Sequence, residues 1–370
     1  MERQAHNSHD PLRVDVDLGA LRRNHERIVE RLPAGTKPIY SVKANAYGHG
    51  VLHVVGELER LGVDAVATAS IGDAIRLRKA GVECQILLFG GHMPAAAPAL
   101  SARGMTVTVA NVETARVVAG AAARMSPVFV KVDCGLGRLG LPLEQAEDVI
   151  TGTLLPAGVA IEGLYTHLPF GDEGGERWAR AGLERFESLV ERLRERGVEF
   201  PIVQALSSPG VSAGLPLVGN AVCTGRLLYG LLPAVGDAGS WGLERVLRGV
   251  STRVVHVNTH TAVARIGAGG RHLVRAGDTT VVIPFGRSGG NLMDVGCGPE
   301  LVHRGQRASV ISISLEHATL NLGSASAAVG DEVTILGGDD GAAVTLAELA
   351  RWSHLEPLDA LVALDRGGAI

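Results

Sequence analysis

The sequence predicts an α/β protein in which a (β/α)8, TIM-like barrel is followed by a mostly β C-terminal domain. Eight short apolar runs alternate with amphipathic stretches up to about residue 230, a pattern typical of parallel strands joined by crossover helices. After about Gly236 the helical periodicity fades, and short Val-rich runs separated by Gly, Asp and Asn take over. We therefore expect an N-terminal segment over residues 1–12, disordered or joined to the β domain, a barrel over residues 13–236 and the β domain over residues 237–370.

Each expected element follows from a local pattern. Asp17 can cap a helix whose apolar positions, such as Leu18, Leu21 and Ile28, recur at close to 3.6 residues. The expected barrel strands are 39–42, 65–67, 86–89, 106–109, 128–132, 161–165, 202–206 and a last one near 227–229. Helical patterns between them cover 51–61, 71–80, 112–121, 143–151 and 176–196. In the β domain we expect strands at 252–257, 279–283, 308–313, 318–322 and 332–336.

Composition limits the classes of partner. The 370 residues are 46% hydrophobic, enough for two domains of ordinary size. A net charge of −4 gives no reason to expect nucleic acid or an anionic membrane as a partner. The four cysteines are scattered, so their spacing predicts neither a disulfide framework nor a metal site. The polar N-terminus has no signal-peptide core, and no apolar run approaches the roughly 20 residues of a membrane span, so we expect a cytoplasmic protein.

Residues 42–50, VKANAYGHG, place Lys43 at the end of an apolar run and Tyr47 four residues later. A lysine at a strand end can form an imine with an aldehyde, and pyridoxal 5′-phosphate (PLP) is the usual aldehyde. The string resembles the lysine segment of the alanine racemase family, the fold type III group of PLP enzymes. The resemblance implies that Lys43 bonds C4′ of PLP and later acts as a base at the Cα of an amino-acid substrate, while Tyr47 binds the phosphate.

Two further segments extend the resemblance. Residues 131–140, KVDCGLGRLG, resemble the family loop in which an arginine, here Arg138, lies near the cofactor's phenolic oxygen and the substrate carboxylate. A guanidinium suits this role because its fork pairs with anionic oxygens. The family lysine at the position of Lys131 is often carbamylated and braces that arginine. In residues 163–168, GLYTHL, the resemblance implies that His167 packs its imidazole on the pyridine ring, which requires no shifted pKa.

The phosphate site is implied by residues near the last two strands. Ser208 begins an expected helix, whose N-terminus favours an anion, and it matches the family serine that touches the phosphate; an N-cap role is compatible with this. Residues 225–230, GRLLYG, resemble the family's Gly-x-x-x-Tyr-Gly loop, which implies Gly225, Arg226 and Tyr229 around the phosphate. Phosphate sites after strands seven and eight are common in such barrels.

One departure from the family pattern concerns the ring of the cofactor. The family has an arginine facing the pyridine nitrogen, where this chain has Cys223. A cationic partner keeps that nitrogen unprotonated and weakens PLP as an electron sink. A neutral thiol does not act as such a cation, and it does not supply the carboxylate that would protonate the ring.

A larger departure concerns the second base. The family uses a tyrosine from the β domain of a neighbouring subunit, but the last of the four tyrosines here is Tyr229. The expected position falls near Ala268, the family's Met-Asp pair is replaced around Ser314-Leu315, and the pair Met293-Asp294 comes too early. A water relay is one substitute. Other candidates, each with a surface or structural role as the more ordinary interpretation, are His260, His272, His303, His317 and Cys297.

Three functions remain open. The first is an amino-acid racemase with an altered substrate and second base. The second is a PLP enzyme with one-sided Cα chemistry, such as retro-aldol cleavage, one-carbon transfer or decarboxylation, and the third is a non-catalytic PLP-binding protein, which would not need Arg138 and His167. The resemblance also implies a head-to-tail homodimer, because in the family the barrel of one subunit meets the β domain of the other.

Overall fold

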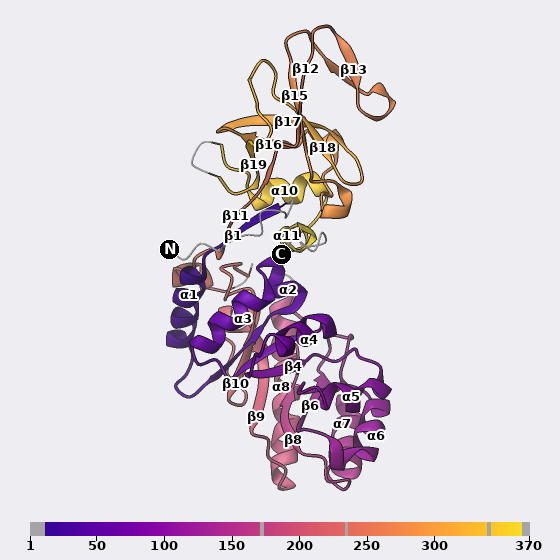
Figure 1. Cartoon of the computed structure of the whole chain (residues 1–370). Coiled ribbons are helices and arrows are strands. Elements are labelled where there is room, and N and C mark those ends of the chain that lie inside the picture. Colours follow the sequence, from indigo (N-terminus) through magenta and orange to yellow (C-terminus); the bar gives the residue numbers. More distant parts are fainter. Residues whose placement is uncertain (1–11, 171–173, 234–235, 339–341, 365–370) are drawn as a thin grey trace. The chain divides into compact units, whose positions relative to one another are not determined.

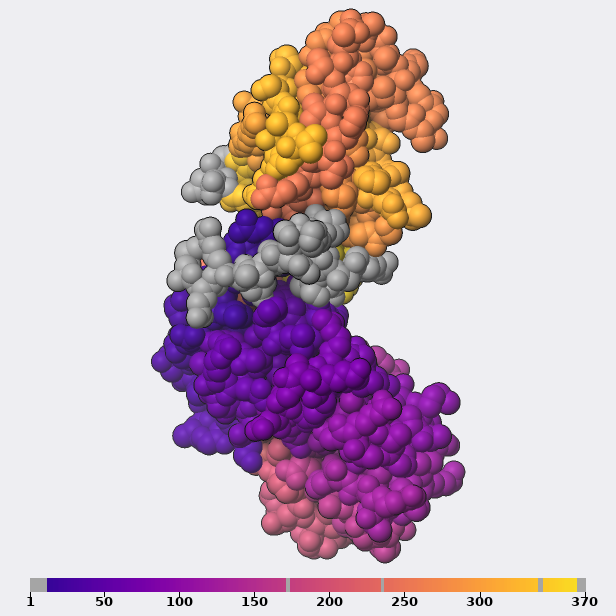
Figure 2. Space-filling model, in the orientation of Figure 1, coloured from indigo at the N-terminus to yellow at the C-terminus, as the bar shows by residue number. Residues whose placement is uncertain are grey.

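The computed structural model describes residues 12–170, 174–233, 236–338 and 342–364. These residues form two compact units: a barrel unit, Leu18–Ala46 with Val51–Val246, and a β unit, which combines residues 12–17, Tyr47–Gly50 and the described residues from Leu247 onward (Figure 1). In the space-filling view the visible surface of the β unit is mostly orange and yellow, the colours of residues after Leu247 (Figure 2). The prediction of a (β/α)8 barrel followed by a mostly β domain is confirmed.

The barrel consists of eight parallel strands. In sheet order these are β4 (Gln85–Leu88), β3 (Ala65–Thr68), β2 (Lys37–Ser41), β10 (Ala221–Thr224), β9 (Ile202–Ser207), β8 (Ile161–Tyr165), β6 (Val128–Asp133) and β5 (Thr108–Val109). A parallel bridge between Leu87 and Thr106, with hydrogen bonds from Leu88 N to Thr106 O (2.8 Å) and from Thr106 N to Ile86 O (2.9 Å), joins the two ends of this order. The sheet therefore closes and leaves no open edge.

Helices connect the strands in the order that the sequence predicts. They are α1 (Leu18–Arg31), α2 (Lys43–Gly48), α3 (Val51–Arg60), α4 (Ile71–Lys79), α5 (Ala97–Ser101), α6 (Val112–Gly120), α7 (Leu143–Val149), α8 (Gly175–Glu195) and α9 (Ser208–Ser212), with short turns η1 (Pro94–Ala96), η2 (Ala122–Arg124) and η4 (Ala238–Trp241). A π-helical segment, η3 (Ile150–Leu154), continues α7. Caps match the residue types: Ser70 and Asn111 accept the N–H groups of Asp73 and Thr114 at the starts of α4 and α6.

The barrel interior is apolar, with side chains contributed by several strands. The members of this cluster are Ile39, Ala65, Ala67, Leu87, Phe129, Tyr165, Ile202 and Ala221. Alanines on β3 and β10 lie on either side of Ile39 of β2, whereas the neighbouring strands β9, β8 and β6 contribute the larger Ile202, Tyr165 and Phe129. One of the largest members, Tyr165, is buried, and its hydroxyl lies 3.1 Å from Thr108 Oγ1, so its polar end is paired inside the core.

The position predicted for the eighth strand is wrong. Residues 227–229 form a buried turn, in which Tyr229 N donates to Arg226 O (3.2 Å) and Gly230 N to Leu227 O (3.0 Å), and the strand is β10, a few residues earlier. A short apolar run fits a buried turn as well as a buried strand, so its hydrophobicity alone does not decide between them.

The β unit contains an eight-stranded antiparallel sheet. Its order is β1 (Leu12–Val16), β11 (Leu247–Arg253), β19 (Glu332–Leu336), β16 (Glu300–His303), β17 (Gln306–Ile313), β18 (Ala318–Asn321), β15 (Thr279–Ile283) and β12 (His256–Thr259), and a separate hairpin joins β13 (Ala264–Ile266) and β14 (His272–Val274). Strand β1 pairs with β11 with Val14 opposite Val250, so residues 12–16 belong to this sheet; the other residues of the expected N-terminal segment lie outside the described ones.

Two helices and three short turns complete the β unit: α10 (Leu346–Ser353), α11 (Pro357–Ala363), η5 (Ala268–Gly270), η6 (Arg287–Gly289) and η7 (Val295–Cys297). A capping box between Thr345 and Glu348 begins α10. The single strand predicted over residues 252–257 is wrong, because the chain changes partners there: Val254 N donates to Asp331 O and Val255 N donates to Val282 O. None of the described helices is both long enough and apolar enough to cross a lipid bilayer.

Candidate functional site

Lys43 follows the carboxyl end of β2 and begins the short helix α2. This helix is left-handed: its residues Ala44, Asn45, Ala46 and Tyr47 have φ values of 51°, 49°, 57° and 56°. Such a conformation costs an L-residue roughly 1–2 kcal/mol, so the four together cost roughly 4–8 kcal/mol. Strain of this size persists only where the surroundings impose it, and it is typical of functional sites.

Hydrogen bonds from neighbouring elements hold this turn. Ala46 N donates to Val42 O (3.0 Å), and Asn45 N donates to the carboxylate of Asp73 in α4 (3.2 Å). The side chain of Asn45 in turn accepts the N–H of Val51 at the start of α3 (2.8 Å). These contacts offset part of the strain and fix the direction in which the chain leaves Lys43.

The electrostatic surroundings of Lys43 are cationic. The pKa of Lys43 lies below its ordinary value, first because surrounding protein displaces water from the amine and then because of Arg138, with a further contribution from Arg226. Lys131, buried in β6, has its pKa lowered to about 8 by burial and then by Arg138, against an opposing effect of Asp133. Lys43 after β2, Lys131 on β6 and Arg138 in the loop after β6 therefore meet at one end of the barrel.

Asp133 organises the loop that carries Arg138. Its Oδ1 accepts the N–H groups of Gly135 (3.0 Å) and Leu136 (2.9 Å), and its Oδ2 accepts that of Gly137 (2.8 Å). The loop then returns to the barrel through β7 (Leu141–Pro142), which pairs in parallel with the end of β6. At Gly140 φ is +132°, and a Cβ there would lie 2.5 Å from the backbone nitrogen of Asp133, so this close return requires glycine.

His167 and Cys223 are both neutral near pH 7. Burial, and then the cations Arg138, Lys131 and Lys43, lower the pKa of His167 to about 4. Burial raises the pKa of Cys223 to about 12, against the effect of Lys43 and Lys131. His167 follows β8 and Cys223 lies near the end of β10, so both are on the same end of the barrel as Lys43. Neither contributes a charge there, so the charges that act on Lys131 are the cation Arg138 and the opposing carboxylate of Asp133.

The residues around Gly225 can bind an anion. The buried Ser208 Oγ accepts the N–H groups of Gly225 (3.1 Å) and Leu227 (3.4 Å), so its own hydrogen points elsewhere. Two buried side-chain atoms on either side of Gly225, Thr224 Oγ1 and Arg226 Nε, find no hydrogen-bond partner among the described residues. Buried polar atoms ordinarily have partners, so these two atoms are suited to the oxygens of a phosphate. The cationic end of the barrel and these donors together suit the phosphate and phenolic oxygen of PLP.

The two tyrosines predicted to bind the cofactor occupy different settings. Tyr229 is buried, and its hydroxyl donates to the carbonyl of Ser41 at the end of β2 (3.2 Å), two residues before Lys43. This contact joins the segment of residues 225–230 to the end of β2. Tyr47 lies at the end of the left-handed turn, and His49 Nδ1 lies 3.0 Å from its backbone oxygen.

The candidates for a second base lie in the β unit. His260 contacts the hydroxyl of Thr280 (3.0 Å), His303 contacts the carboxylate of Asp331 (2.9 Å), and Cys297 contacts His354 (3.4 Å). His272 begins β14, and His317 immediately precedes β18. All of these candidates belong to the β unit. The geometry of the barrel site favours none of them over the others as the second base.

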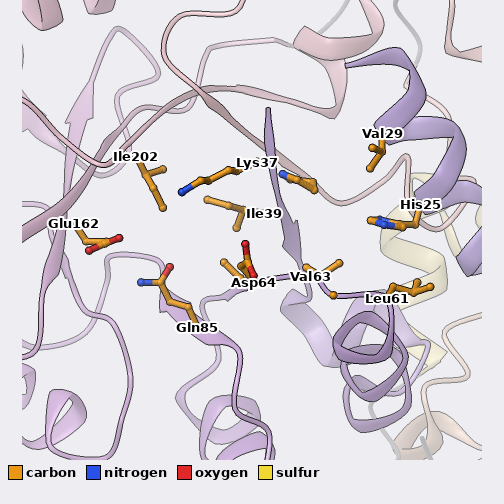
Figure 3. Close-up of a pocket in the computed structure, with 13 residues that line it drawn as sticks. His25, Val29, Lys37, Ile39, Leu61, Val63, Asp64, Gln85, Glu162 and Ile202 are labelled. Atoms are coloured by element: carbon orange, nitrogen blue, oxygen red, sulfur yellow. The ribbon is translucent and has the colours of Figure 1, made fainter. Parts of the chain in front are cut away.

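A cavity of about 390 Å³ lies at the opposite end of the barrel, where strands begin (Figure 3). Lys37 and Ile39 of β2, Gln85 of β4, Glu162 of β8 and Ile202 of β9 line it. Chemistry in such barrels occurs at the carboxyl ends of the strands, so this cavity is separate from the predicted site.

Sequence reasoning missed Thr224, Asn45 and Asp73. Thr224 stands between Cys223 and Gly225, so its position beside two predicted residues was a usable signal. Asn45 lies within the lysine string, but the support of its backbone by Asp73 depends on packing of α4 against the turn, which no local pattern indicates.

Comparison with known proteins places this chain among well-described relatives. A family model described as the alanine racemase N-terminal domain matches residues 16–233, and one described as the alanine racemase C-terminal domain matches residues 248–367. An alanine racemase of Geobacter sulfurreducens is 33% identical over 364 residues, covering 94% of each chain, and one of Streptococcus pneumoniae is 30% identical, covering 93% of each.

Solved structures agree with these matches. The alanine racemase of Clostridium difficile 630 superposes with a TM-score of 0.85 at 24% identity, covering 96% of this chain and 94% of that one. The alanine racemase of E. faecalis superposes with a TM-score of 0.83 at 25% identity, covering 98% of each chain.

Proposed function

We propose, from the premise that this chain belongs to the alanine racemase family, that it is an amino-acid racemase with an altered substrate and with a second acid–base group other than tyrosine. The protein is a PLP-dependent enzyme of the isomerase class that acts on an amino acid. The relatives named above are alanine racemases, so alanine is the first substrate to test.

The observation that carries this proposal is the meeting of Lys43, Arg138 and His167 at the carboxyl ends of the barrel strands. The three groups come from separate elements of the chain, and the pKa of both Lys43 and His167 responds to Arg138. A base, a carboxylate-binding cation and a flat neutral ring are the groups that Cα chemistry on an amino acid requires.

Each residue has a defined part in this chemistry. When bound, PLP withdraws electrons from the substrate Cα and so makes its proton acidic. The lowered pKa of Lys43 increases the fraction of neutral amine that can accept this proton on one face. Arg138 can bind the substrate carboxylate, and the neutral His167 can pack on a ring without adding a charge. Ser208 and the backbone around Gly225 would hold the phosphate, and Cys223 presents a neutral thiol near the ring.

Lys131 is suited to carbamylation. Carbon dioxide adds only to the neutral amine, and a pKa of about 8 leaves about a tenth of Lys131 neutral at pH 7, compared with about 0.03% for a lysine of ordinary pKa. The resulting carbamate would be an anion next to Arg138. We propose that this anion orients the guanidinium toward the substrate carboxylate, as the resemblance to the family implies.

The opposite face of Cα requires a group from outside the barrel unit. We propose a head-to-tail homodimer in which the β unit of one subunit completes the barrel site of the other. The chain has no tyrosine after Tyr229, so the second proton donor is a histidine, Cys297 or a water molecule. A cytoplasmic location also stays a prediction.

The missing tyrosine also favours a second candidate function. If no group replaces it, the enzyme removes and returns the proton, or cleaves a side-chain bond, on the Lys43 face only. Such one-sided chemistry uses the same Lys43, Arg138 and His167. It differs from racemisation only in that no proton donor lies on the opposite face of Cα.

Incubation in D2O separates these functions. We would first reduce the holoenzyme with borohydride and map the modified lysine by mass spectrometry, expecting Lys43, with Lys79→Ala as a control that retains labelling because Lys79 is exposed on α4. Alanine and then other amino acids would be incubated in D2O and resolved by chirality. Deuterium in both enantiomers supports racemisation, deuterium with retained configuration supports one-sided chemistry, and PLP on Lys43 without exchange supports a binding protein. Labelling elsewhere than Lys43 would overturn all three.

A further inference from the structure

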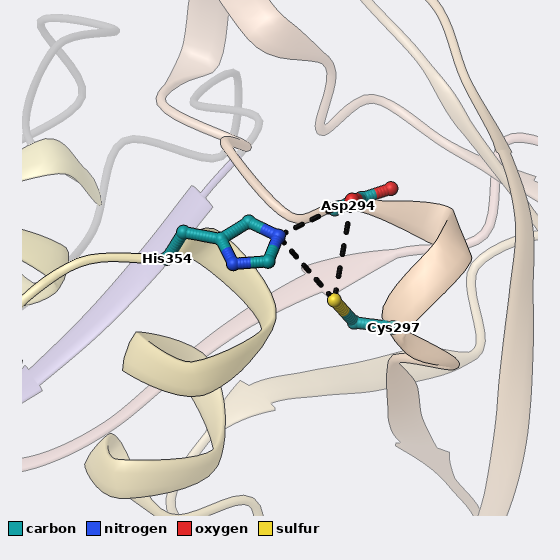
Figure 4. A group of neighbouring side chains, drawn as sticks. All are labelled: Asp294, Cys297 and His354. Carbon is teal, nitrogen blue, oxygen red and sulfur yellow. Dashed lines mark hydrogen bonds and ion pairs between the residues drawn. The ribbon is translucent and has the colours of Figure 1, made fainter.

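Three polar side chains that sequence spacing does not connect meet in the β unit. Asp294 and Cys297 lie on the turn η7, and His354 follows α10 (Figure 4). His354 Nε2 lies 3.2 Å from Asp294 Oδ2 and 3.4 Å from Cys297 Sγ, and the remaining distance, Cys297 Sγ to Asp294 Oδ2, is 4.0 Å. The three atoms thus form a triangle with no side longer than 4.0 Å, and the cysteine is a free thiol.

The backbone holds the two segments in this arrangement. Asp294 caps η7 by accepting the N–H of Gly296 on Oδ1 (2.8 Å), which leaves Oδ2 directed at His354. Asp294 N donates to the carbonyl of Trp352 (2.6 Å), which ties the turn to the last residues of α10. His354 itself has a left-handed backbone (φ 53°), which ends the helix and turns the ring back toward η7.

Hydrogen bonding accounts for this triangle only in part, because the contact from the thiol to the carboxylate is long. Asp294 and Cys297 both approach the same ring nitrogen, Nε2 of His354. If Nε2 carries a hydrogen, it donates it to the carboxylate, and the thiol's hydrogen is left with the long contact of 4.0 Å to Asp294 Oδ2; if Nε2 is unprotonated, its lone pair faces the carboxylate. The arrangement also differs from a catalytic relay, in which the carboxylate and the nucleophile contact opposite nitrogens of the ring.

A metal ion at the centre satisfies all three atoms. Tetrahedral zinc with bonds of about 2.0 Å to nitrogen, 2.1 Å to oxygen and 2.3 Å to sulfur places its ligands about 3.4 Å (N to O), 3.5 Å (N to S) and 3.6 Å (S to O) apart. The observed sides of 3.2, 3.4 and 4.0 Å differ from these by a few tenths of an ångström. A thiolate and an imidazole together select zinc or a similar transition metal over magnesium and calcium, which prefer oxygen.

We propose that Asp294, Cys297 and His354 bind one zinc ion, with solvent in the fourth position, and that the ion fastens the turn η7 to the end of α10. A zinc-bound thiolate carries no proton, so this assignment removes Cys297 from the candidates for the second proton donor. The exposure of Asp294 and Cys297 makes the ion exchangeable with the medium. Cysteine spacing did not predict this site, because its third ligand lies 57 residues beyond Cys297.

The proposal is tested on the reduced holoenzyme with Zn2+ and with Co2+ as a spectroscopic probe. We expect one equivalent of Zn2+ to bind, with one sulfur at about 2.3 Å and nitrogen or oxygen at about 2.0–2.1 Å by X-ray absorption, and Co2+ to give the strong visible bands of a tetrahedral thiolate site. Cys297→Ser should remove the sulfur signal, and His354→Gln should weaken binding by at least about 100-fold, since loss of a residue that only orients a ligand already costs about 10- to 100-fold.

Matched controls make the result specific. Cys84→Ser and His256→Gln change a partly exposed cysteine of the barrel and an exposed histidine of the β unit, and both should bind Zn2+ as the parent does. Circular dichroism of each variant verifies its fold. If Cys297→Ser does not fold, the X-ray absorption spectrum of the unmutated protein shows whether sulfur is a zinc ligand. The proposal would be overturned by an X-ray absorption spectrum of the zinc-bound protein that shows no sulfur ligand. It would also be overturned if Cys297→Ser and His354→Gln bound Zn2+ as tightly as the parent protein does.

Discussion

Replacing Lys131 by methionine should stabilise the cofactor-free protein. Lys131 is 4% exposed, and lowering its pKa from the ordinary 10.5 to about 8 corresponds to about 3 kcal/mol of unfavourable free energy for the charged amine in the folded state. Its Nζ lies 5.7 Å from the centre of the Tyr165 ring, and loss of this cation–π contact costs about 1 kcal/mol. The unfavourable free energy of burying the charge is larger, so Lys131→Met should raise the free energy of unfolding by about 2 kcal/mol at pH 7.

The gain should depend on pH in a defined direction. The pKa of Lys131 is lower in the folded state than in the unfolded state, so the charged amine destabilises the fold fully below about pH 8. Between about pH 8 and pH 10.5 the folded protein loses this proton first, and the penalty disappears. The difference in unfolding free energy between Lys131→Met and the parent should therefore shrink as the pH rises through this window.

Carbamylation provides the third arm of the test. A carbamate replaces the buried cation by an anion next to Arg138, so added bicarbonate should stabilise the parent and leave Lys131→Met unchanged. Urea unfolding with and without bicarbonate measures this difference, and intact mass detects the added carbon dioxide. A methionine variant less stable than the parent in bicarbonate-free buffer at pH 7 would show that burying the charged amine does not outweigh the contacts that Lys131 makes.

Other predictions follow from the same contacts. His167→Phe should leave the pH dependence of kcat/KM between about pH 5 and 8 unchanged, because the pKa of His167 is about 4; loss of an ionisation in that range would contradict this. Ser208→Ala should weaken PLP binding about tenfold or more by removing a phosphate donor, measured by cofactor titration, and equal affinity would refute that role. Asn24→Ala leaves the buried carbonyl of Leu228 and the partly buried carbonyl of Glu244 without its amide (2.9 and 2.7 Å) and should cost about 3 kcal/mol of unfolding free energy; a loss under about 1 kcal/mol in urea would contradict it.

Local patterns were sufficient for the order of the elements. The helix of residues 176–196 was predicted to within one residue at each end of α8, because its apolar face recurs over more than five turns. Runs as short as three residues were less informative, because a short apolar segment between Gly225 and Gly230 can be buried as a strand or as a turn. Residues 227–229 form a turn. The change of hydrogen-bond partner strand at Val254 likewise cannot be predicted from a single Val-rich run.

The sequence by itself determined the fold class and the cofactor, and it predicted Lys43 as the lysine that would hold this cofactor, because strand ends and their glycine-containing strings are contiguous features. Only the tertiary structure decided the charge state of the site: the neutral His167 and Cys223 and the lowered pKa of Lys131 arise from burial and from Arg138, which depend on packing of separate elements. The left-handed turn after Lys43 and the triangle of Asp294, Cys297 and His354 have the same origin, since contacts between distant segments impose conformations and neighbours that no local pattern specifies.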